Sequence, residues 1–248
     1  MTVGNKVAAV VLAAGKGTRM GSEKHKVLHE LQGKPLLGHV LDTLALLEVT
    51  ETVVVVGAGR EQITTAFPDL TTTIQEQQLG TGHAVLMAAD MLDGFEGVVL
   101  VLYGDVPLVS HQTMQALTRK VDADTALAVL GFTPDDPRAY GRLVTDAAGT
   151  LERIVEFADA DETEQAIGFC NSGIMAIRAD AMFNLLPRIT NDNAKGEYYL
   201  TDIVALARDA GLRVATAQAD EWEVTGVNSQ FELAALEKLL KAREYQEA

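Results

Sequence analysis

The chain has 248 residues, 48% of them hydrophobic, and a formal net charge of −15 at neutral pH. It is long enough to bury a large core as one domain, and it holds no apolar run near the roughly 20 residues that cross a bilayer. The negative charge argues against a nucleic-acid-binding surface, and a single cysteine excludes an intrachain disulfide, which together with the absence of a signal-peptide pattern fits the cytoplasm.

Strand-like and helix-like segments alternate through the first half of the chain. Apolar runs bounded by glycines predict strands, and apolar residues at helical spacing predict helices. The strands are apolar throughout, which is typical of a parallel sheet covered on both faces. We therefore expect an α/β, Rossmann-like fold with strands over residues 7–13, 52–56, 97–103 and 125–132, and helices over residues 35–48, 82–92 and 110–120.

The second half has a different pattern, which predicts a lid that contains a β-hairpin and lies over the sheet. No repeat, low-complexity segment or hinge divides the chain, so we expect a single domain. The hairpin strands are expected over residues 141–145 and 151–157, further strands over 168–178 and 213–217, and helices over 179–186, 200–210 and 229–247.

A glycine-rich loop follows the first strand and reads Leu-Ala-Ala-Gly-Lys-Gly-Thr-Arg over residues 12–19. Glycines allow backbone amides to approach a phosphate, and four cations, Lys16, Arg19, Lys24 and Lys26, lie in or close to the loop. The sequence does not fit a Walker loop, and Met20 stands where a dinucleotide fingerprint needs its third glycine. The loop indicates a polyphosphate ligand such as a nucleotide; a flexible loop with solvated lysines is the alternative.

Asp105 comes directly after the expected strand 97–103, at the same sheet edge as the glycine-rich loop. Mg²⁺ prefers oxygen ligands and commonly takes one or two from protein. Asp105 is therefore a candidate magnesium ligand, which Asn228 could complete with its amide oxygen; the alternative is an aspartate in a turn before Pro107.

A second glycine-rich loop, residues 78–83, opens a helix, and Gln75 precedes it at the end of a strand. Its backbone amides and the Gln75 amide are suited to bind a pyrimidine base or a ribose. The alternative is an ordinary helix N-terminus with its caps, which has the same sequence pattern. Polar residues of the second half suggest a pocket for a sugar: residues 140–142, Glu156, Asn171 and residues 191–201. We find no Ser-His-Asp set and no zinc-type spacing of cysteines or histidines.

At these residues the chain resembles the uridylyltransferase half of the bacterial bifunctional GlmU family, the N-acetylglucosamine-1-phosphate uridylyltransferase/glucosamine-1-phosphate acetyltransferases. The likeness covers nearly the whole chain as an ordered series of motifs. These are LAAGKGTRM (12–20), HKVLHEL (25–31), EQQLGTGHA (76–84), LYGDVPL (102–108), YGR (140–142), IVEFADA (154–160), CNSGIMA (170–176), NAKGEYYLTD (193–202) and GVNS (226–229).

The resemblance implies Mg²⁺-dependent transfer of UMP from UTP to N-acetylglucosamine 1-phosphate, which gives UDP-N-acetylglucosamine for cell-envelope polysaccharides and pyrophosphate. It implies a nucleotide-binding portion over about residues 1–135, a sugar-binding portion over about 136–228 and a final helix over 229–248. It also implies roles for individual residues. The nucleotide would be held by Leu12, Ala13, Ala14 and Gly15, its triphosphate stabilised by Arg19 and Lys26, and its uracil and ribose contacted by Gln75, Gly80 and Thr81. The sugar nucleotide would be held by Tyr103, Gly104, Gly141, Glu156 and Asn171, and Mg²⁺ would be bound by Asp105 and Asn228.

Three departures from the family pattern qualify the resemblance. Phe157 and Ala158 stand where many relatives have a basic or histidine pair, and Ser172 replaces the commoner threonine. The chain ends in the helix after Ser229, so neither the β-helix nor acetyl transfer is predicted, and no oligomeric state is implied. The alternatives are a nucleotidyltransferase for another sugar 1-phosphate, a silent nucleotide-sugar-binding domain and, more remotely, a redox Rossmann enzyme.

Overall fold

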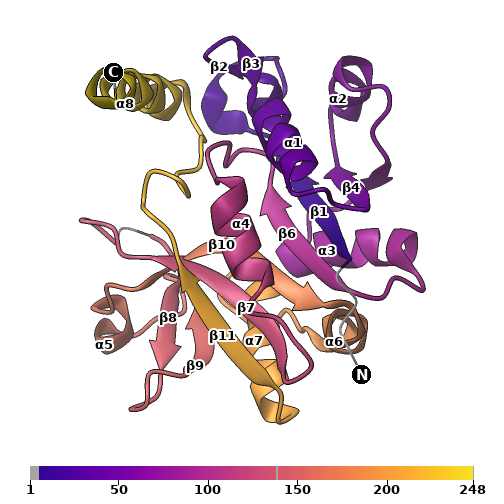
Figure 1. Cartoon of the computed structure of the whole chain (residues 1–248), viewed down its shortest axis with the longest axis vertical. Coiled ribbons are helices and arrows are strands. Elements are labelled where there is room, and N and C mark those ends of the chain that lie inside the picture. The colour runs from indigo at the N-terminus through magenta and orange to yellow at the C-terminus, as the bar shows by residue number, and fades with distance from the viewer. Residues whose placement is uncertain (1–5, 138, 248) are drawn as a thin grey trace.

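The computed structural model describes residues 6–137 and 139–247 (Figure 1). Residues 1–5, on which the expected absence of a signal peptide partly depends, lie outside this range. Within it, no helix combines the length and the apolar character that crossing a membrane requires.

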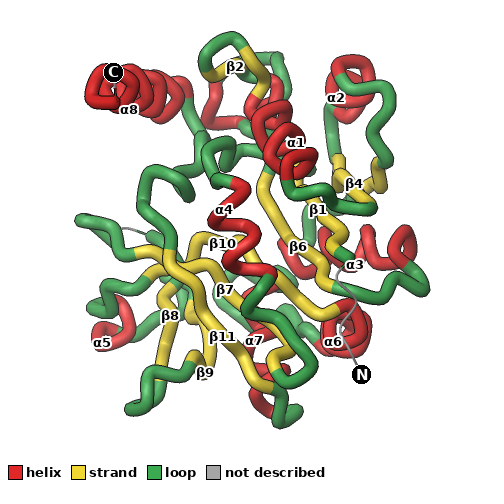
Figure 2. Tube along the Cα trace, in the orientation of Figure 1, coloured by secondary structure: helices red, strands yellow, loops and turns green. Residues whose placement is uncertain are grey.

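A twisted central sheet runs through the molecule in the order β11-β7-β10-β6-β1-β4-β5 (Figure 2). Among the described residues, the pairings along this path are parallel except the two that β10 makes with β6 and β7. The sheet is therefore mostly parallel, as predicted. Its strands are β1 (Val7–Ala13), β4 (Glu51–Val56), β5 (Thr72–Ile74), β6 (Val98–Tyr103), β7 (Thr125–Phe132), β10 (Cys170–Arg178) and β11 (Arg213–Gln218).

Helices cover both faces of the sheet, and the side chains of β1 explain why. Ala8, Val10 and Leu12 belong to one apolar cluster, whereas the alternate residues of β1 belong to the other. A strand that buries both faces needs a cover on each side. One face packs against α3 (Thr81–Ala89), α6 (Ala179–Leu185) and α7 (Ile203–Asp209), and the other against α1 (Leu36–Leu46), α2 (Arg60–Ala66) and α4 (His111–Thr118).

The second half of the chain contributes more to the sheet than the expected lid. The predicted hairpin, β8 (Arg142–Thr145) and β9 (Leu151–Val155), lies beside the main path, but β10 is inserted between β6 and β7. The apolar sequence of β10 predicts a strand, but it does not indicate which strands β10 pairs with. The C-terminal helix α8 spans Gln230–Glu247 and packs its buried Leu236 with Leu31 and Val227.

Several short elements were not predicted. These are the small strands β2 (Glu30–Leu31) and β3 (Lys34–Pro35), the helix α2, the one-turn helix α5 (Glu162–Gln165) and 3-10 turns at Thr18–Met20 and Lys26–Leu28. α2 has only one buried apolar residue, Ile63, so its sequence shows no helical periodicity.

The loops that follow β1 and β6 meet at the carboxyl-terminal edge of the sheet. The chain runs from β1 to β4 and β5 on one side and then returns to β6 on the other, so the order reverses beside β1. Leu12 is paired with Tyr103, and the Gly104 amide donates to the Leu12 carbonyl at 3.0 Å. In open α/β sheets such a reversal opens a crevice for ligands at the carboxyl ends of the strands.

Candidate active site

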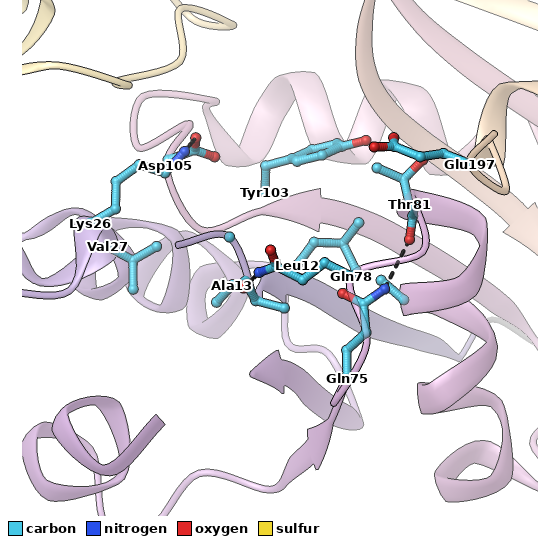
Figure 3. A pocket seen from close by; sticks show the side chains of 14 residues that line it. Leu12, Ala13, Lys26, Val27, Gln75, Gln78, Thr81, Tyr103, Asp105 and Glu197 are labelled. Carbon is cyan, nitrogen blue, oxygen red and sulfur yellow. Dashed lines mark hydrogen bonds and ion pairs between the residues drawn. The ribbon is translucent and has the colours of Figure 1, made fainter. Parts of the chain in front are cut away.

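A pocket of about 240 Å³ occupies this crevice. Figure 3 shows Lys26 and Asp105 together at one end, Thr81 and Glu197 at the other, and Tyr103 between them. Ten of the predicted site residues line the pocket: Leu12, Ala13, Ala14, Gly15, Lys26, Gln75, Gly80, Thr81, Tyr103 and Asp105. The structure therefore brings the two glycine-rich loops and the end of β6 around one cavity.

At one end of the pocket, two cationic side chains surround the side-chain oxygens of Asp105 and Asn228, and the four form a single cluster. The Lys26 ammonium is paired with the Asp105 carboxylate and donates to Asn228 Oδ1 at 3.2 Å. Arg19 donates to the same Asn228 oxygen at 3.0 Å. The four predicted residues come from three distant parts of the chain. The side chains of Lys26 and Asp105 are only 13% and 14% exposed, so water screens their charges weakly.

The Asp105 and Asn228 oxygens fit the predicted magnesium site. Because one ammonium contacts both, they lie close enough together to share one small cation. In the described part of the chain, no group of three or more acidic, histidine or cysteine side chains is arranged to hold a metal ion. Two protein oxygens are what Mg²⁺ commonly takes when phosphates and water supply the rest.

At the other end, a hydrogen-bond network fixes the second glycine-rich loop. Gln75 is buried, and its amide nitrogen donates to the Gly80 carbonyl at 2.9 Å and lies 3.0 Å from His83 Nδ1. The Thr81 hydroxyl accepts from the Leu200 amide at 3.0 Å. These bonds orient the Gln75 amide and the Gly80–Thr81 backbone toward the cavity before any ligand arrives.

Three of the residues predicted for the sugar, Gly141, Glu156 and Asn171, belong to a region next to Tyr103. The Gly141 carbonyl accepts from the Asn171 amide at 2.8 Å, and Glu156 accepts from Thr201 at 3.3 Å. A Cβ on Gly173, which has φ +87°, would lie 2.6 Å from the Tyr103 ring, so the turn after Asn171 presses against this ring. Tyr103 thus connects the two groups of predicted residues.

Burial governs the protonation of this region. It raises the pKa of Tyr103, and the carboxylates of Glu156 and Asp105 raise it further. Burial also raises the pKa of Glu156, against the opposing hydrogen bond from Thr201. Tyr103 therefore presents a neutral hydroxyl between the two groups of predicted residues at physiological pH.

Arg142 is the buried support of this side of the site. It is 2% exposed, and its guanidinium donates to the carbonyls of Gln165 (3.2 Å), Pro137 (3.3 Å) and Tyr140. The Phe157 ring lies 5.6 Å from the guanidinium carbon. The departure at Phe157 therefore has a structural role, because its ring covers the arginine that holds the residues around Gly141.

We expect Arg142→Met to lower the free energy of unfolding by at least about 3 kcal/mol, because buried carbonyls lose a charged donor. Denaturant unfolding measures this change. Arg153→Met is the matched control: Arg153 is 46% exposed and paired with Glu164, and a surface pair contributes about 1 kcal/mol or less. Equal losses in both variants would contradict the role of Arg142.

His25 is a buried histidine in the basic loop. Its backbone amide donates to Gln62 on α2 at 2.8 Å, but neither ring nitrogen has a partner among the described residues. Burial lowers the pKa of His25 below its ordinary 6.5, and the charges of Lys26 and His29 lower it further. The imidazole is therefore neutral at neutral pH.

This burial predicts a pH dependence of stability. Between the lowered pKa and 6.5 the unfolded chain binds more protons than the folded chain, so the free energy of unfolding falls as the pH falls through this window. We expect His25→Leu to reduce the drop in Tm between about pH 7.5 and about pH 5.5. An identical drop in the variant and the wild type, measured by thermal unfolding, would show that His25 does not contribute.

Four residues that line the pocket were not selected from the sequence, although all four lie in quoted motifs: Val27, Gln78, Ala84 and Glu197. Gln78 donates to the Ala14 carbonyl and so joins the two glycine-rich loops. Glu197 reaches the pocket from the turn that Asn193 organises through bonds to the Lys195 and Glu197 amides, both at 3.2 Å. Six predicted residues, Arg19, Gly104, Gly141, Glu156, Asn171 and Asn228, lie outside the pocket lining.

Comparison with known proteins agrees with this architecture. Residues 9–171 match the family model of the MobA-like NTP transferase domain. The "Bifunctional protein GlmU" of Zymomonas mobilis is 51% identical over 253 residues, which cover 100% of this chain and 56% of the relative. Its namesake from Rhodospirillum rubrum is 51% identical over 243 residues, 96% of this chain and 54% of the relative.

The chain thus spans about half the length of the curated relatives it matches. The family model covers every residue of the pocket lining except Glu197, from β1 to the start of β10. The fold, the position of the pocket and the family match point to the same conclusion: the chain belongs to the MobA-like NTP transferase family and is a nucleotidyltransferase.

Proposed function

We propose that the chain transfers UMP from UTP to N-acetylglucosamine 1-phosphate, with Mg²⁺, and releases pyrophosphate. The observation that carries the proposal is the convergence of Arg19, Lys26, Asp105 and Asn228 at one end of a pocket whose other end holds Gln75 and Thr81. The first set suits a triphosphate, and the second suits a base and its ribose. The similarity to proteins named GlmU supports the choice of uridine and of this sugar.

The reaction needs positioning and charge neutralisation more than a general base. An oxygen of the sugar phosphate, already anionic, bonds to the α-phosphorus of UTP, and the bond from that phosphorus to the pyrophosphate oxygen breaks. Mg²⁺, held by Asp105 and Asn228, would supply positive charge to the phosphates. Lys26 and Arg19 offset the charge that develops on the leaving pyrophosphate.

The remaining predicted residues orient the two substrates. The backbone of Leu12 to Gly15 lies along the pocket wall, where its amides are suited to the nucleotide. The Gln75 amide nitrogen is engaged by Gly80 and His83, and its oxygen is suited to accept from a pyrimidine N–H. In this proposal Glu156, Asn171 and Gly141 hold the sugar. Holding two anionic reactants in line accounts for a large part of the rate enhancement in such sites.

Pyrophosphate release tests the proposal. The purified chain is given Mg²⁺ with each nucleoside triphosphate, and each is paired with N-acetylglucosamine 1-phosphate or glucose 1-phosphate. We expect release with UTP and the N-acetylated sugar. Release confined to another pair would overturn the substrates but keep the mechanism, and no release with any pair would favour the silent binding domain.

The proposal includes a cytoplasmic location and a product used for cell-envelope polysaccharides.

A further inference from the structure

The segment between β11 and α8 brings Asn228 to the active site, and a buried carboxylate holds this segment. Glu223 is 7% exposed. Its Oε1 accepts from the Ser110 amide at 3.1 Å and from the Thr113 hydroxyl at 2.9 Å, and its Oε2 lies 3.0 Å from the same hydroxyl. Glu223 is thus fixed to the first turn of α4 by its whole carboxylate.

The partners of Glu223 belong to the segment that carries Asp105. Ser110 and Thr113 follow Asp105 in the connection from β6 into α4, and Ser110 is the N-cap of that helix. A second bond joins the same two segments nearer the site, where the Val227 amide donates to the Asp105 carbonyl at 2.9 Å. The Asp105 and Asn228 segments are therefore bound to each other at two points.

Asn228 is also held from its C-terminal side. Its backbone amide donates to Glu232 Oε2 at 2.6 Å, and the Glu232 amide donates to the Ser229 hydroxyl at 3.2 Å. The Ser229 hydroxyl thus caps the start of α8, and the Glu232 side chain reaches back to the residue before this cap. The Asn228 side chain is left to accept from Arg19 and Lys26 through Oδ1.

We propose that Glu223 is a positioning residue that sets the separation between the oxygens of Asp105 and Asn228 and thereby determines metal affinity. This inference rests on the metal site of the proposed function. Glu223 itself has no contact with Lys26, Arg19 or Asp105 among its hydrogen bonds, so it acts through the backbone from residue 223 to residue 228. Supporting groups of this kind commonly govern metal affinity without touching the metal.

Binding of Mn²⁺ as a spectroscopic probe tests the proposal, because electron paramagnetic resonance counts the free ion without requiring turnover. The titration uses the full chain with UTP present and no sugar phosphate. We expect Glu223→Gln, which keeps the shape but removes the charge and one acceptor, to weaken Mn²⁺ binding by about tenfold. The KM for the sugar phosphate is expected to stay unchanged, since the hydrogen bonds of Glu223 join it to the start of α4 and not to Gly141 or Asn171.

Glu221→Gln is the matched control, because Glu221 is an exposed neighbour in the same segment. It removes the same charge and is expected to leave Mn²⁺ binding at the wild-type value. If Glu223→Gln only lowers Tm and leaves Mn²⁺ affinity unchanged, Glu223 only stabilises the start of α4 and the proposal is overturned.

Two further variants keep the outcome decisive. Asn228→Ala should weaken Mn²⁺ binding directly, and adding Glu223→Gln to it should cause little further loss. If Asn228→Ala has no effect, the metal site of the proposed function is wrong; if Asn228→Ala acts and Glu223→Gln does not, only the present inference fails. Should Glu223→Gln not fold, Thr113→Val removes the hydroxyl donor with little change of shape and is expected to weaken Mn²⁺ binding in the same direction. A folded Thr113→Val with wild-type affinity would overturn the inference in that case.

Discussion

Lys26→Ala is expected to lower the steady-state rate of pyrophosphate release by about three powers of ten, the scale of losing a cation in a phosphoryl-transfer site. Its ammonium is the centre of the charge cluster and contacts both Asp105 and Asn228. Because its side chain is only 13% exposed, water screens its charge weakly, and its loss removes a strong local positive charge. Initial rates at saturating UTP and sugar phosphate measure the loss.

Lys24→Ala provides the comparison within the same loop. Lys24 forms a pair with Glu30 at 3.1 Å, and both side chains are about half exposed, at 44% and 53%. Removing it should change the rate little, since exposed pairs contribute weakly. A Lys26→Ala rate within a few-fold of the wild-type rate would contradict the role assigned to Lys26.

Gly80→Ala is expected to destabilise the protein by about 4 kcal/mol, as strain in the backbone adds to a steric clash with the Tyr198 backbone. Gly80 has φ 118° and ψ 173°, a conformation essentially restricted to glycine. A Cβ there would lie 2.5 Å from the Tyr198 carbonyl oxygen and 2.7 Å from its nitrogen. The Tyr198 backbone cannot move away from the added Cβ, because its amide donates to the Leu79 carbonyl and its carbonyl accepts from the Gly82 amide.

Denaturant unfolding gives the stability of Gly80→Ala, and the KM for UTP shows the effect on the pocket, which we expect to weaken binding. Gly94→Ala separates the two causes: Gly94 also has a positive φ, +74°, but no atom lies within 4 Å of the added Cβ. It should lose only about 1 to 2 kcal/mol, the cost of the left-handed conformation alone. Equal losses would show that the Tyr198 contact contributes nothing.

Much of the fold could be predicted from the sequence because its signals are local. The apolar runs of β1, β6 and β7 match their predicted ranges to within one residue, and the glycine-rich loop follows β1 as expected. The position of Asp105 beside that loop follows from parallel strands ending at one edge. The metal and catalytic roles of the site residues stay predictions, since they depend on ligands.

The unpredicted features depend on tertiary contacts. Gln78 lines the pocket where it donates to the Ala14 carbonyl, and Glu197 does so beside Tyr198, which pairs with the second glycine-rich loop. No sequence periodicity encodes either contact. Phe157 looks like a departure from a binding pattern, whereas its contact with Arg142 depends on the burial of a residue fifteen positions earlier. Likewise, the sequence marks Asn228 as a possible ligand but gives no reason to select Glu223.

The position of β10 has a consequence for how the chain acquires its structure during synthesis. Until residues 170–178 leave the ribosome, β6 and β7 each present an unpaired apolar edge where β10 will later lie. Such edges invite pairing with other chains, and pairings between distant segments form slowly. We therefore expect the nascent first half, although it contains most of the pocket, to be prone to aggregation until β10 pairs with both strands.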